Sequence, residues 1–501
     1  MNTGETMTNA TAMDTAPSRT RSWNVAMAAS PGSLELSIPS SSIDGVVPLA
    51  LRGGRLLSNG PGWTRIGEQT AHPFDGHGYV RAFSFDNDGG CRLRARFVMT
   101  PSYVAEAAAG HLMHRGLATN LPGPFWHNIR FSTIRNVANT TIQHRGRRLI
   151  AGWEGGAPTA LDADTLETIG EEHFGGALAG QVTLAHFKRD ARKQRFVTCS
   201  VQYGRHPRFT FREFANGDDA LVSTRVGVLG GMAFAHDFAM TPSHYILGGN
   251  PIRIRPGEAA KMLLGTSTLL RAVGPDVERL GTLHLVPRDV DGPVRTVRLP
   301  ETAYVVHFGN TFERGDDIVV DAAVFARMGF GEEFGYTGPL TPFDPGLPDA
   351  RGPQRLMRIT IPSGSDVATW APLTPHGVDF PRFHPDHEGY ETPALFGATR
   401  RDTRYSDPFD SIIRIDLKDR ERPASLWTTP QNVFVGEPIF VPDPARPEAG
   451  HVLAILSYGL EARSALVIFD ALALEAGPVA TVPLPLLPVA FHGDWDGPNH
   501  P

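Results

Sequence analysis

Short runs in which apolar and polar residues alternate recur along the whole chain. Residues 79–98, YVRAFSFDNDGGCRLRARFV, contain two such runs on either side of the turn DNDGG. Alternation with a period of two predicts half-buried β-strands, and a turn between two of them predicts an antiparallel hairpin. The same arrangement returns at residues 208–229, 354–370, 411–427 and 465–484. The chain is therefore predicted to consist mainly of β-hairpins.

Roughly six hairpin units are spread over the chain, as a radial array of small antiparallel sheets requires. Their spacing is irregular, which excludes a strict repeat such as a WD array. Few segments have a helical pattern. The best is SYVAEAAAGHLMHR at 102–115, whose alanines favour a helix outside the β scaffold. The predicted fold class is all-β, of the propeller type.

The first 22 residues are polar and lack a charged head followed by an apolar run, so we expect a disordered tail over 1–22 rather than a secretory signal. Residues 23–501 are predicted to form a single domain. No stretch has the roughly 18 to 20 consecutive apolar residues that would span a bilayer. We expect a cytoplasmic protein, for which peripheral contact with a membrane is compatible with the sequence.

Charge and cysteine content exclude several functions. The net charge is −6 and the pI near 6.3, so we expect no nucleic acid as partner. Cys91 and Cys199 are the two cysteines, and no Cys-x-x-Cys motif exists. A thiolate metal site and a disulfide framework are both disfavoured. The sequence makes no prediction of the oligomeric state.

Four of the 19 histidines share a setting that the others lack. Each stands at or beside the end of a β-rich run, after small or apolar residues that would bury it; these are His186, His236, His307 and His492. A buried imidazole needs a hydrogen-bond or metal partner. The separations of 50, 71 and 185 residues (186 to 236, 236 to 307, 307 to 492) suit a site on the axis of a closed β structure. Four unrelated core histidines are the alternative interpretation.

Six passages of the chain, in this order, resemble the landmarks of the carotenoid cleavage oxygenases. They are HPFDGHGYVRAFSF, NVANTTIQHRGRRLIAGWEGGAPTALDADTLETIG, MAFAHDFAMTPSHYILGGNP, HFGNTFERGDDIVVDAAVF, GEPIFVPDP and LPVAFHGDW. The resemblance extends from about Gly53 to Trp495. It implies a seven-bladed β-propeller with an iron ion on its axis under a dome of helices and loops. The family includes apocarotenoid, retinoid and lignostilbene enzymes.

The resemblance also implies the site residues. The four histidines would hold one Fe(II) per chain, and three glutamates would orient three of them: Glu154, Glu391 and Glu437. The match at Glu391 is weaker, because Glu391-Thr392-Pro393 stands for the usual Glu-Phe-Pro. Phe187 also replaces the proline that usually follows the first histidine.

Oxidative alkene cleavage requires a metal that binds O₂ and passes single electrons, which excludes zinc and favours iron. The lignostilbene enzymes place a lysine before the first glutamate to bind a phenol, whereas Trp153 stands there in this chain. Trp153 is therefore predicted to contact an apolar polyene, a carotenoid or apocarotenoid that is cleaved with O₂ into two carbonyl products. Phe74 matches an aromatic residue that the family commonly has near the cavity, with core packing as the alternative role. The alternatives are a dioxygenase of the same fold acting on stilbenes or phenylpropenoids, and a propeller that binds without catalysis.

Overall fold

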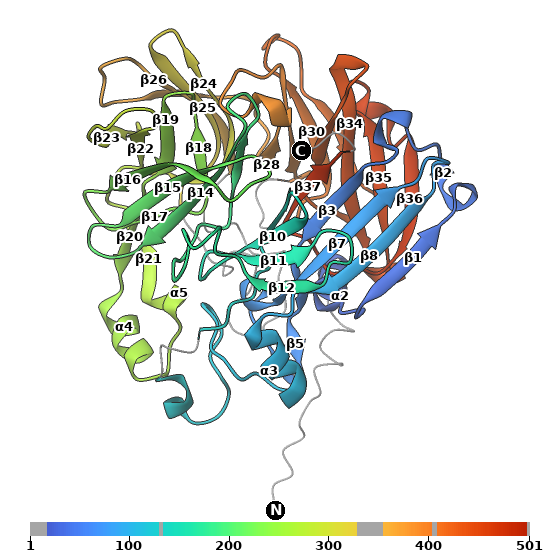
Figure 1. Cartoon of the computed structure of the whole chain (residues 1–501), viewed down its shortest axis with the longest axis horizontal. Helices are drawn as coiled ribbons and strands as arrows, with labels where there is room; N and C mark the ends of the chain where they lie inside the picture. The colour runs from blue at the N-terminus through green and yellow to red at the C-terminus, as the bar shows by residue number, and fades with distance from the viewer. Residues whose placement is uncertain (1–17, 130–133, 328–353, 403–407, 498–501) are drawn as a thin grey trace, which may run out of the picture.

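The computed structural model describes residues 18–129, 134–327, 354–402 and 408–497, which form a seven-bladed β-propeller (Figure 1). Seven antiparallel sheets of four to six strands are its blades. The all-β propeller predicted from the sequence is confirmed. The five hairpins predicted from alternation are all present as paired strands of blades.

The blades follow one another along the chain. The first contains β1 (Leu34–Ile38), β3 (Arg55–Asn59), β4 (Pro61–Trp63), β7 (His77–Phe85), β8 (Cys91–Phe97) and β37 (His492–Asp496). The second contains β9 (Thr141–Arg145), β10 (Arg148–Gly152), β11 (Thr159–Asp162) and β12 (Thr168–Glu171). The third contains β13 (Lys188–Asp190), β14 (Arg195–Gln202), β15 (Arg208–Ala215) and β16 (Leu221–Val228).

The fourth blade contains β18 (Phe238–Met240), β19 (His244–Gly248), β22 (Thr282–Pro287) and β23 (Arg295–Arg298). The fifth contains β24 (Tyr304–Arg314), β25 (Asp317–Phe325), β26 (Arg355–Ile361) and β27 (Thr369–Pro372). The sixth contains β28 (Val378–Arg382), β29 (Ala394–Thr399), β30 (Ser411–Asp416) and β31 (Ser425–Thr428). The seventh contains β2 (Asp44–Gly45), β32 (Phe434–Val435), β33 (Ile439–Asp443), β34 (Arg446–Tyr458), β35 (Arg463–Asp470) and β36 (Ala480–Pro485).

The two ends of the chain close the ring. β37, from the end of the chain, pairs antiparallel with β3, from its beginning, in a register that sets His492 opposite Asn59 (Figure 1). β2 likewise joins the seventh blade through β36. Closure by strand pairing removes exposed sheet edges between the first and last blades. It also fixes the position of His492.

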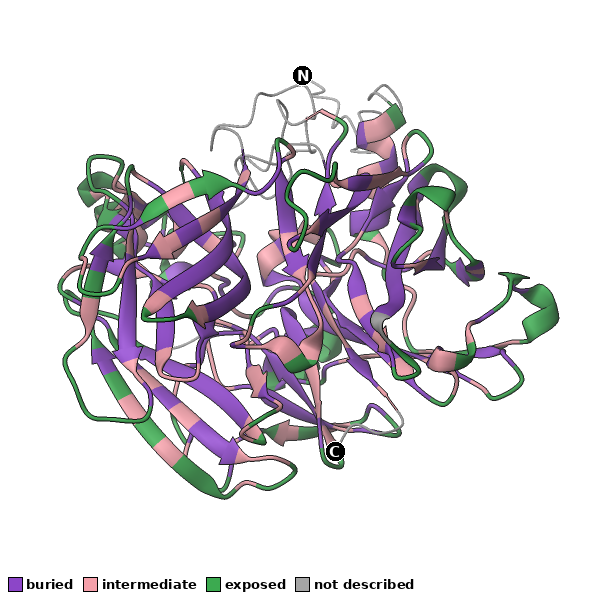
Figure 2. Ribbon diagram, turned by 90° about the horizontal axis from the view of Figure 1, so that it is seen from above, coloured by how far each residue is buried: buried purple, intermediate pink, exposed green. Residues whose placement is uncertain are grey.

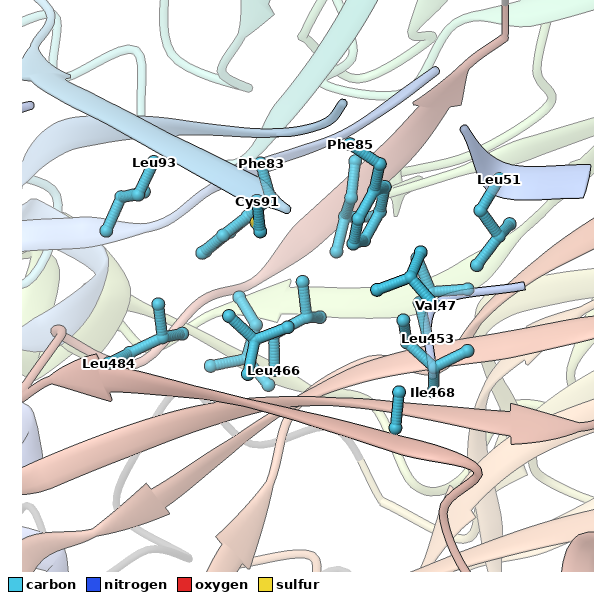
Figure 3. Packing of buried hydrophobic residues seen from close by; sticks show 14 of the residues in the cluster. Val47, Leu51, Phe83, Phe85, Cys91, Leu93, Leu453, Leu466, Ile468 and Leu484 are labelled. Carbon is cyan, nitrogen blue, oxygen red and sulfur yellow. The ribbon is translucent and has the colours of Figure 1, made fainter. Parts of the chain in front are cut away.

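Apolar side chains fill the space between neighbouring blades. Phe83 and Leu93 of the first blade face Leu453, Leu466 and Ile468 of the seventh in one buried cluster (Figure 3). The strands are buried along most of their length, and exposure concentrates at loops and outer strands (Figure 2). Strands covered on both faces explain why the runs of β34 and β35 are more continuously apolar than the hairpins of the outer edge.

Truncating this interface is expected to destabilise the propeller. Leu466 is fully buried, so Leu466→Ala should lower the free energy of unfolding by about 2 to 5 kcal/mol. Leu472 is 49% exposed, and Leu472→Ala should change it by less than about 0.5 kcal/mol. Denaturant unfolding followed by fluorescence measures both. Equal shifts for the two variants would contradict packing between blades as the source of stability.

Few helices accompany the blades: α2 (Ser18–Ala28), α3 (Pro101–Ala109), α4 (Pro256–Leu263) and α5 (Leu269–Ala272). α3 confirms the predicted helix over residues 102–109, begins one residue earlier and ends before residues 110–115. α2 corrects the predicted tail, because residues 18–22 belong to this helix and Ser22 donates a hydrogen bond to the Asn432 carbonyl. Residues 1–17 lie outside the described part of the chain. None of the helices that the structure describes is long and apolar enough to cross a membrane.

Candidate metal centre

The four predicted ligand histidines come from four blades and meet at one point. His186 lies two residues before β13, His236 two residues before β18, His307 within β24 and His492 at the start of β37. β13, β18 and β24 are the first strands of their sheets, and β24 contacts both β18 and β28. First strands of propeller blades line the axis, so residues distant in sequence converge there.

The geometry of the four rings fits one metal ion. The Nε2 atoms of His186 and His236 are 3.2 Å apart, and those of His236 and His307 are 3.1 Å apart. One ligand nitrogen from each of the four histidines lies within 4.8 Å of those of the other three. Bonds of roughly 2.1 Å at right angles place neighbouring ligand nitrogens about 3 Å apart. Four imidazoles are a donor set that iron, copper, nickel and zinc all accept.

Carboxylates hold three of the rings by their other nitrogen. Nδ1 of His236 is paired with Oε1 of Glu154. Nδ1 of His492 lies 3.0 Å from Oε1 of Glu437, whose Oε2 also accepts the Gly493 amide at 2.8 Å. A protonated Nδ1 leaves the Nε2 lone pair directed at the shared point, so these carboxylates fix the tautomer that a metal requires.

The third carboxylate corrects the sequence prediction. Nδ1 of His307 lies 2.6 Å from Oδ1 of Asp379. Glu391 contacts no histidine of the cluster; its side chain is 57% exposed and accepts a hydrogen bond from Arg314 at 2.6 Å. The sequence carried a usable signal, because Asp379-Phe380-Pro381 is the family's Glu-Phe-Pro with aspartate for glutamate.

The backbone around Asp379 brings this shorter carboxylate into range. β28 has a bulge between Asp379 and Arg382, and Phe380 adopts a positive φ of 51°. A bulge redirects a side chain, and a positive φ at a non-glycine residue is costly unless its surroundings enforce it. Here the Phe380 amide donates to Asp379 Oδ1 at 2.8 Å, which stabilises that conformation.

His186 is held differently from the other three. Its Nδ1 is 3.9 Å from Oδ1 of Asp237, beyond hydrogen-bond distance, and Asp237 pairs instead with Lys188 at 3.1 Å. Phe187, which replaces the usual proline, is buried and stacks on Phe196 at 5.5 Å. The substitution therefore serves packing within the blade and leaves the ring of His186 in the cluster.

Burial dominates the electrostatics of the cluster. It lowers the pKa of His186 well below the ordinary value, and the neighbouring imidazoles act in the same direction. Burial also lowers the pKa of His492, although Glu437 opposes the change. At His236 burial is outweighed by Glu154, which raises the pKa. Burial opposes ionisation of Glu154 as well, yet the His236 ring lowers the pKa of that carboxyl.

An apolar cavity of about 310 Å³ adjoins the cluster. His236, His307 and His492 line it together with both predicted substrate residues, Phe74 and Trp153. Trp153 is 2% exposed, and the Phe74 ring lies 6.0 Å from that of Phe491. Among the described residues that line this cavity there is no lysine and no tyrosine. An elongated apolar molecule would lose its water shell on entering.

A second, smaller cavity of about 120 Å³ contacts the cluster and has both polar and apolar lining residues. His186, His307 and His492 line it with charged groups that include Lys188, Arg382 and Glu388. Burial raises the pKa of Glu388, and the nearby Lys188 opposes that shift. The histidines thus border one apolar cavity and one of mixed polarity.

A β-propeller with four convergent histidines, three carboxylate partners and an apolar cavity agrees with what the resemblance to the carotenoid cleavage oxygenases implies. The profile of a known family, described as retinal pigment epithelial membrane protein, matches residues 29–496. The chain belongs to this family of carotenoid cleavage oxygenases.

Curated relatives cover nearly the whole chain. Apocarotenoid-15,15'-oxygenase from Synechocystis sp. is 30% identical over 90% of this chain and 92% of the relative. Carotenoid cleavage dioxygenase 7 from Oryza sativa is 29% identical over 92% of this chain and 88% of the relative. Isoeugenol monooxygenase from Pseudomonas putida is 30% identical over 94% of this chain and 97% of the relative. Among solved structures, cobalt-substituted Synechocystis apocarotenoid oxygenase superposes with a TM-score of 0.87 at 29% identity, covering 95% of this chain and 99% of that one.

Proposed function

We propose that this protein uses one Fe(II), held by His186, His236, His307 and His492, to cleave a conjugated C=C bond of a carotenoid or apocarotenoid with O₂. The products would be two carbonyl compounds. The convergence of four imidazole nitrogens within 4.8 Å, beside an apolar cavity, is the observation that carries the proposal. Iron, when bound by four neutral ligands, would supply open positions and one-electron chemistry toward O₂.

The chain's own residues have separate tasks in this proposal. Glu154, Asp379 and Glu437 keep Nδ1 of their histidines protonated and the rings oriented. Phe74 and Trp153 form part of an apolar wall that would hold the polyene and exclude water from the reacting carbons. Neither aromatic side chain has an ionisable group, so their contribution is positioning.

Two observations support a polyene over a phenol as substrate. The described lining has no lysine or tyrosine with which to bind a phenolate. The solved Synechocystis oxygenase structures include variants of a tryptophan, of the glutamate directly after it, and of a threonine thirteen residues before the tryptophan. Trp153, Glu154 and Thr140 have the same spacing, and all three line the cavity.

Cleavage of a phenylpropenoid is the second candidate, favoured by the isoeugenol monooxygenase relative. The test is product identification by mass spectrometry under ¹⁸O₂ with carotenes, apocarotenals, a hydroxystilbene and isoeugenol, on protein purified without oxygen and assayed for iron. We expect one iron per chain and aldehyde products from polyenes. Cleavage of only the phenols would support the second candidate, and absence of iron binding would overturn both in favour of a binding module.

We also propose that the protein takes its substrate from a membrane surface on the cytoplasmic side. Four large apolar side chains are exposed near one another: Phe125, Trp126, Leu263 and Leu264. Gly265 packs against the backbone oxygen of Phe125, which joins the two segments. Leu117 and Leu270, which lie a few residues from these two segments in the sequence, line the apolar cavity. Exposed apolar side chains grouped in this way are typical of contact with a bilayer.

Vesicle binding tests this contact. Wild-type protein should float with neutral phosphatidylcholine vesicles. Trp126→Ser combined with Leu264→Ser should lower the partition constant for lipid by on the order of a hundredfold or more, because each substitution loses roughly 2 kcal/mol of apolar burial in lipid. Val290→Ser, at an equally exposed valine outside the patch, is the control. Flotation of all three proteins to the same extent would contradict the proposed surface.

A further inference from the structure

β16 lies at the rim of the propeller and is the outermost strand of the third blade (Figure 1). It has eight residues, Leu221–Val228, and among the described strands it pairs only with β15. The outermost strands of the other six blades have two to five residues: β1, β2, β12, β23, β27 and β31. The N–H and C=O groups along an unpaired edge are a template for pairing with another strand. β16 is the longest such outer edge of the described blades.

The two faces of β16 differ in what they contact. A Cβ at Gly227 would lie 2.6 Å from Cγ2 of Val286, so Gly227 and the residues two and four positions before it face the fourth blade. The opposite face consists of four exposed side chains: Val222, Thr224, Val226 and Val228. Outer edges are commonly protected by lysine or proline, and β16 contains neither. It therefore has an unprotected edge beside an apolar face.

The exposed face of β16 carries no charge. Arg225 is the one charged residue of the strand, and it belongs to the face toward the fourth blade. Its Nη2 donates to the Asp289 carbonyl oxygen at 3.3 Å, and its Nη1 lies 3.8 Å from Oδ1 of Asp291. The whole chain has a net charge of −6, so two copies repel each other. Contact between two copies is least opposed at an uncharged surface such as this one.

We propose that β16 pairs antiparallel with β16 of a second copy of this chain, about a two-fold axis at Thr224. Antiparallel pairing sets residues of the same face opposite each other, so Thr224 would lie opposite Thr224, and Val222 opposite Val226 of the second copy. Thr–Thr pairs and pairs of branched side chains are favourable cross-strand neighbours. An axis one residue later would set Arg225 opposite Arg225, and like charges directly opposite each other are destabilising. The charge pattern therefore selects the register as well as the partner.

Engineered cysteines test both the contact and its register. In Thr224→Cys the two thiols would face each other across the axis with Cα atoms about 5 Å apart, which a disulfide can span. We expect mild oxidation to give a covalent dimer. In Val222→Cys the two thiols would lie four residues apart along the strand (226 − 222), about 14 Å, and should not react with each other. A mixture of Val222→Cys and Val226→Cys should form a mixed dimer.

Thr369→Cys is the matched control for this cross-linking. Thr369 is an exposed threonine on β27, the outermost strand of the fifth blade. We expect it to stay monomeric under the same oxidation, because β27 has four residues and ends in a proline. The native Cys91 and Cys199 are buried and should not contribute.

Sedimentation equilibrium measures the association without cross-linking. We expect the wild type to dimerise with a Kd in the micromolar range, because one pair of strands is a small interface. Thr224→Lys sets two ammonium groups opposite each other and should raise Kd by about tenfold or more. Thr224→Val preserves the shape of the side chain and should leave Kd close to that of the wild type. The unfolding midpoint of each variant shows that its fold is intact.

Selective cross-linking of Thr224→Cys supports the pairing. A wild type that stays monomeric at every soluble concentration overturns it, as does a dimer that Thr224→Lys leaves intact. Cross-linking of Val222→Cys alone as fast as that of Thr224→Cys also overturns it, because random collisions do not distinguish the two positions. None of these measurements needs iron or a substrate, so the outcome is independent of the proposed function.

Discussion

His186→Ala is expected to yield a folded protein with little bound iron and no measurable cleavage. Four histidines share the binding free energy, which is about 10 to 16 kcal/mol for structural zinc held by four protein ligands and is lower for Fe(II). Loss of one ligand should therefore weaken iron binding on the order of a hundredfold or more. His186 is the most informative choice because, among the described residues, no carboxylate lies within hydrogen-bond distance of its Nδ1. Its removal leaves no buried carboxylate without its histidine.

Iron per chain, measured after anaerobic reconstitution and desalting, is the readout. His284→Ala is the control, because His284 is also a largely buried histidine but hydrogen-bonds to Thr282 and Thr296 outside the cluster. That variant should lose stability and keep its iron. If His186→Ala retains a full complement of iron, the four-histidine centre is wrong.

Much of the fold could be predicted because strands and turns are determined largely by residues that are close together in the sequence. Alternation along residues 79–98 and 208–229 identified strands and turns that the structure contains as β7 with β8 and β15 with β16. The histidines also carried a local signal, since each ends or adjoins an apolar run. Their convergence is not local: it depends on ring closure through β37 and β3, which pattern alone cannot specify.

The sequence contains a motif for each of two candidate carboxylates, and only the three-dimensional structure decides between them. Glu391 and Asp379 are twelve residues apart (391 − 379), and both precede a proline within two residues. The bulge and the positive φ after Asp379 decide which carboxylate reaches His307, and neither is visible in the sequence. The helix at residues 18–28 was missed because its sequence is largely polar, and its contacts come from distant parts of the chain: β34 of the seventh blade, β4 of the first and Asp410 before β30.

The pair Asp379 and Glu391 provides the second large expected effect. Asp379→Asn should lower iron affinity or kcat by about 10- to 100-fold, because the amide cannot supply the negative charge that orients His307 and raises its basicity. Glu391→Gln should change neither iron affinity nor kcat, because Glu391 pairs with Arg314 away from the histidines. Both side chains of that ion pair are exposed, so its loss should cost at most about 1 kcal/mol of stability. Both substitutions remove one carboxylate with almost no change of shape, so each is the control for the other.

Which of the two variants loses iron affinity or activity shows whether Asp379 or Glu391 is the carboxylate partner of His307. Iron titration and steady-state cleavage of one polyene, measured on both variants, should show a loss only in Asp379→Asn. Asp379→Glu should recover part of the loss, because it restores the charge but must fit a longer side chain into a position shaped by the bulge. A loss confined to Glu391→Gln would instead mean that the loop from 383 to 393 rearranges when iron binds and that the carboxylate predicted from the sequence is the functional one. The aspartate accounts for the site without such movement, because its oxygen already lies 2.6 Å from His307.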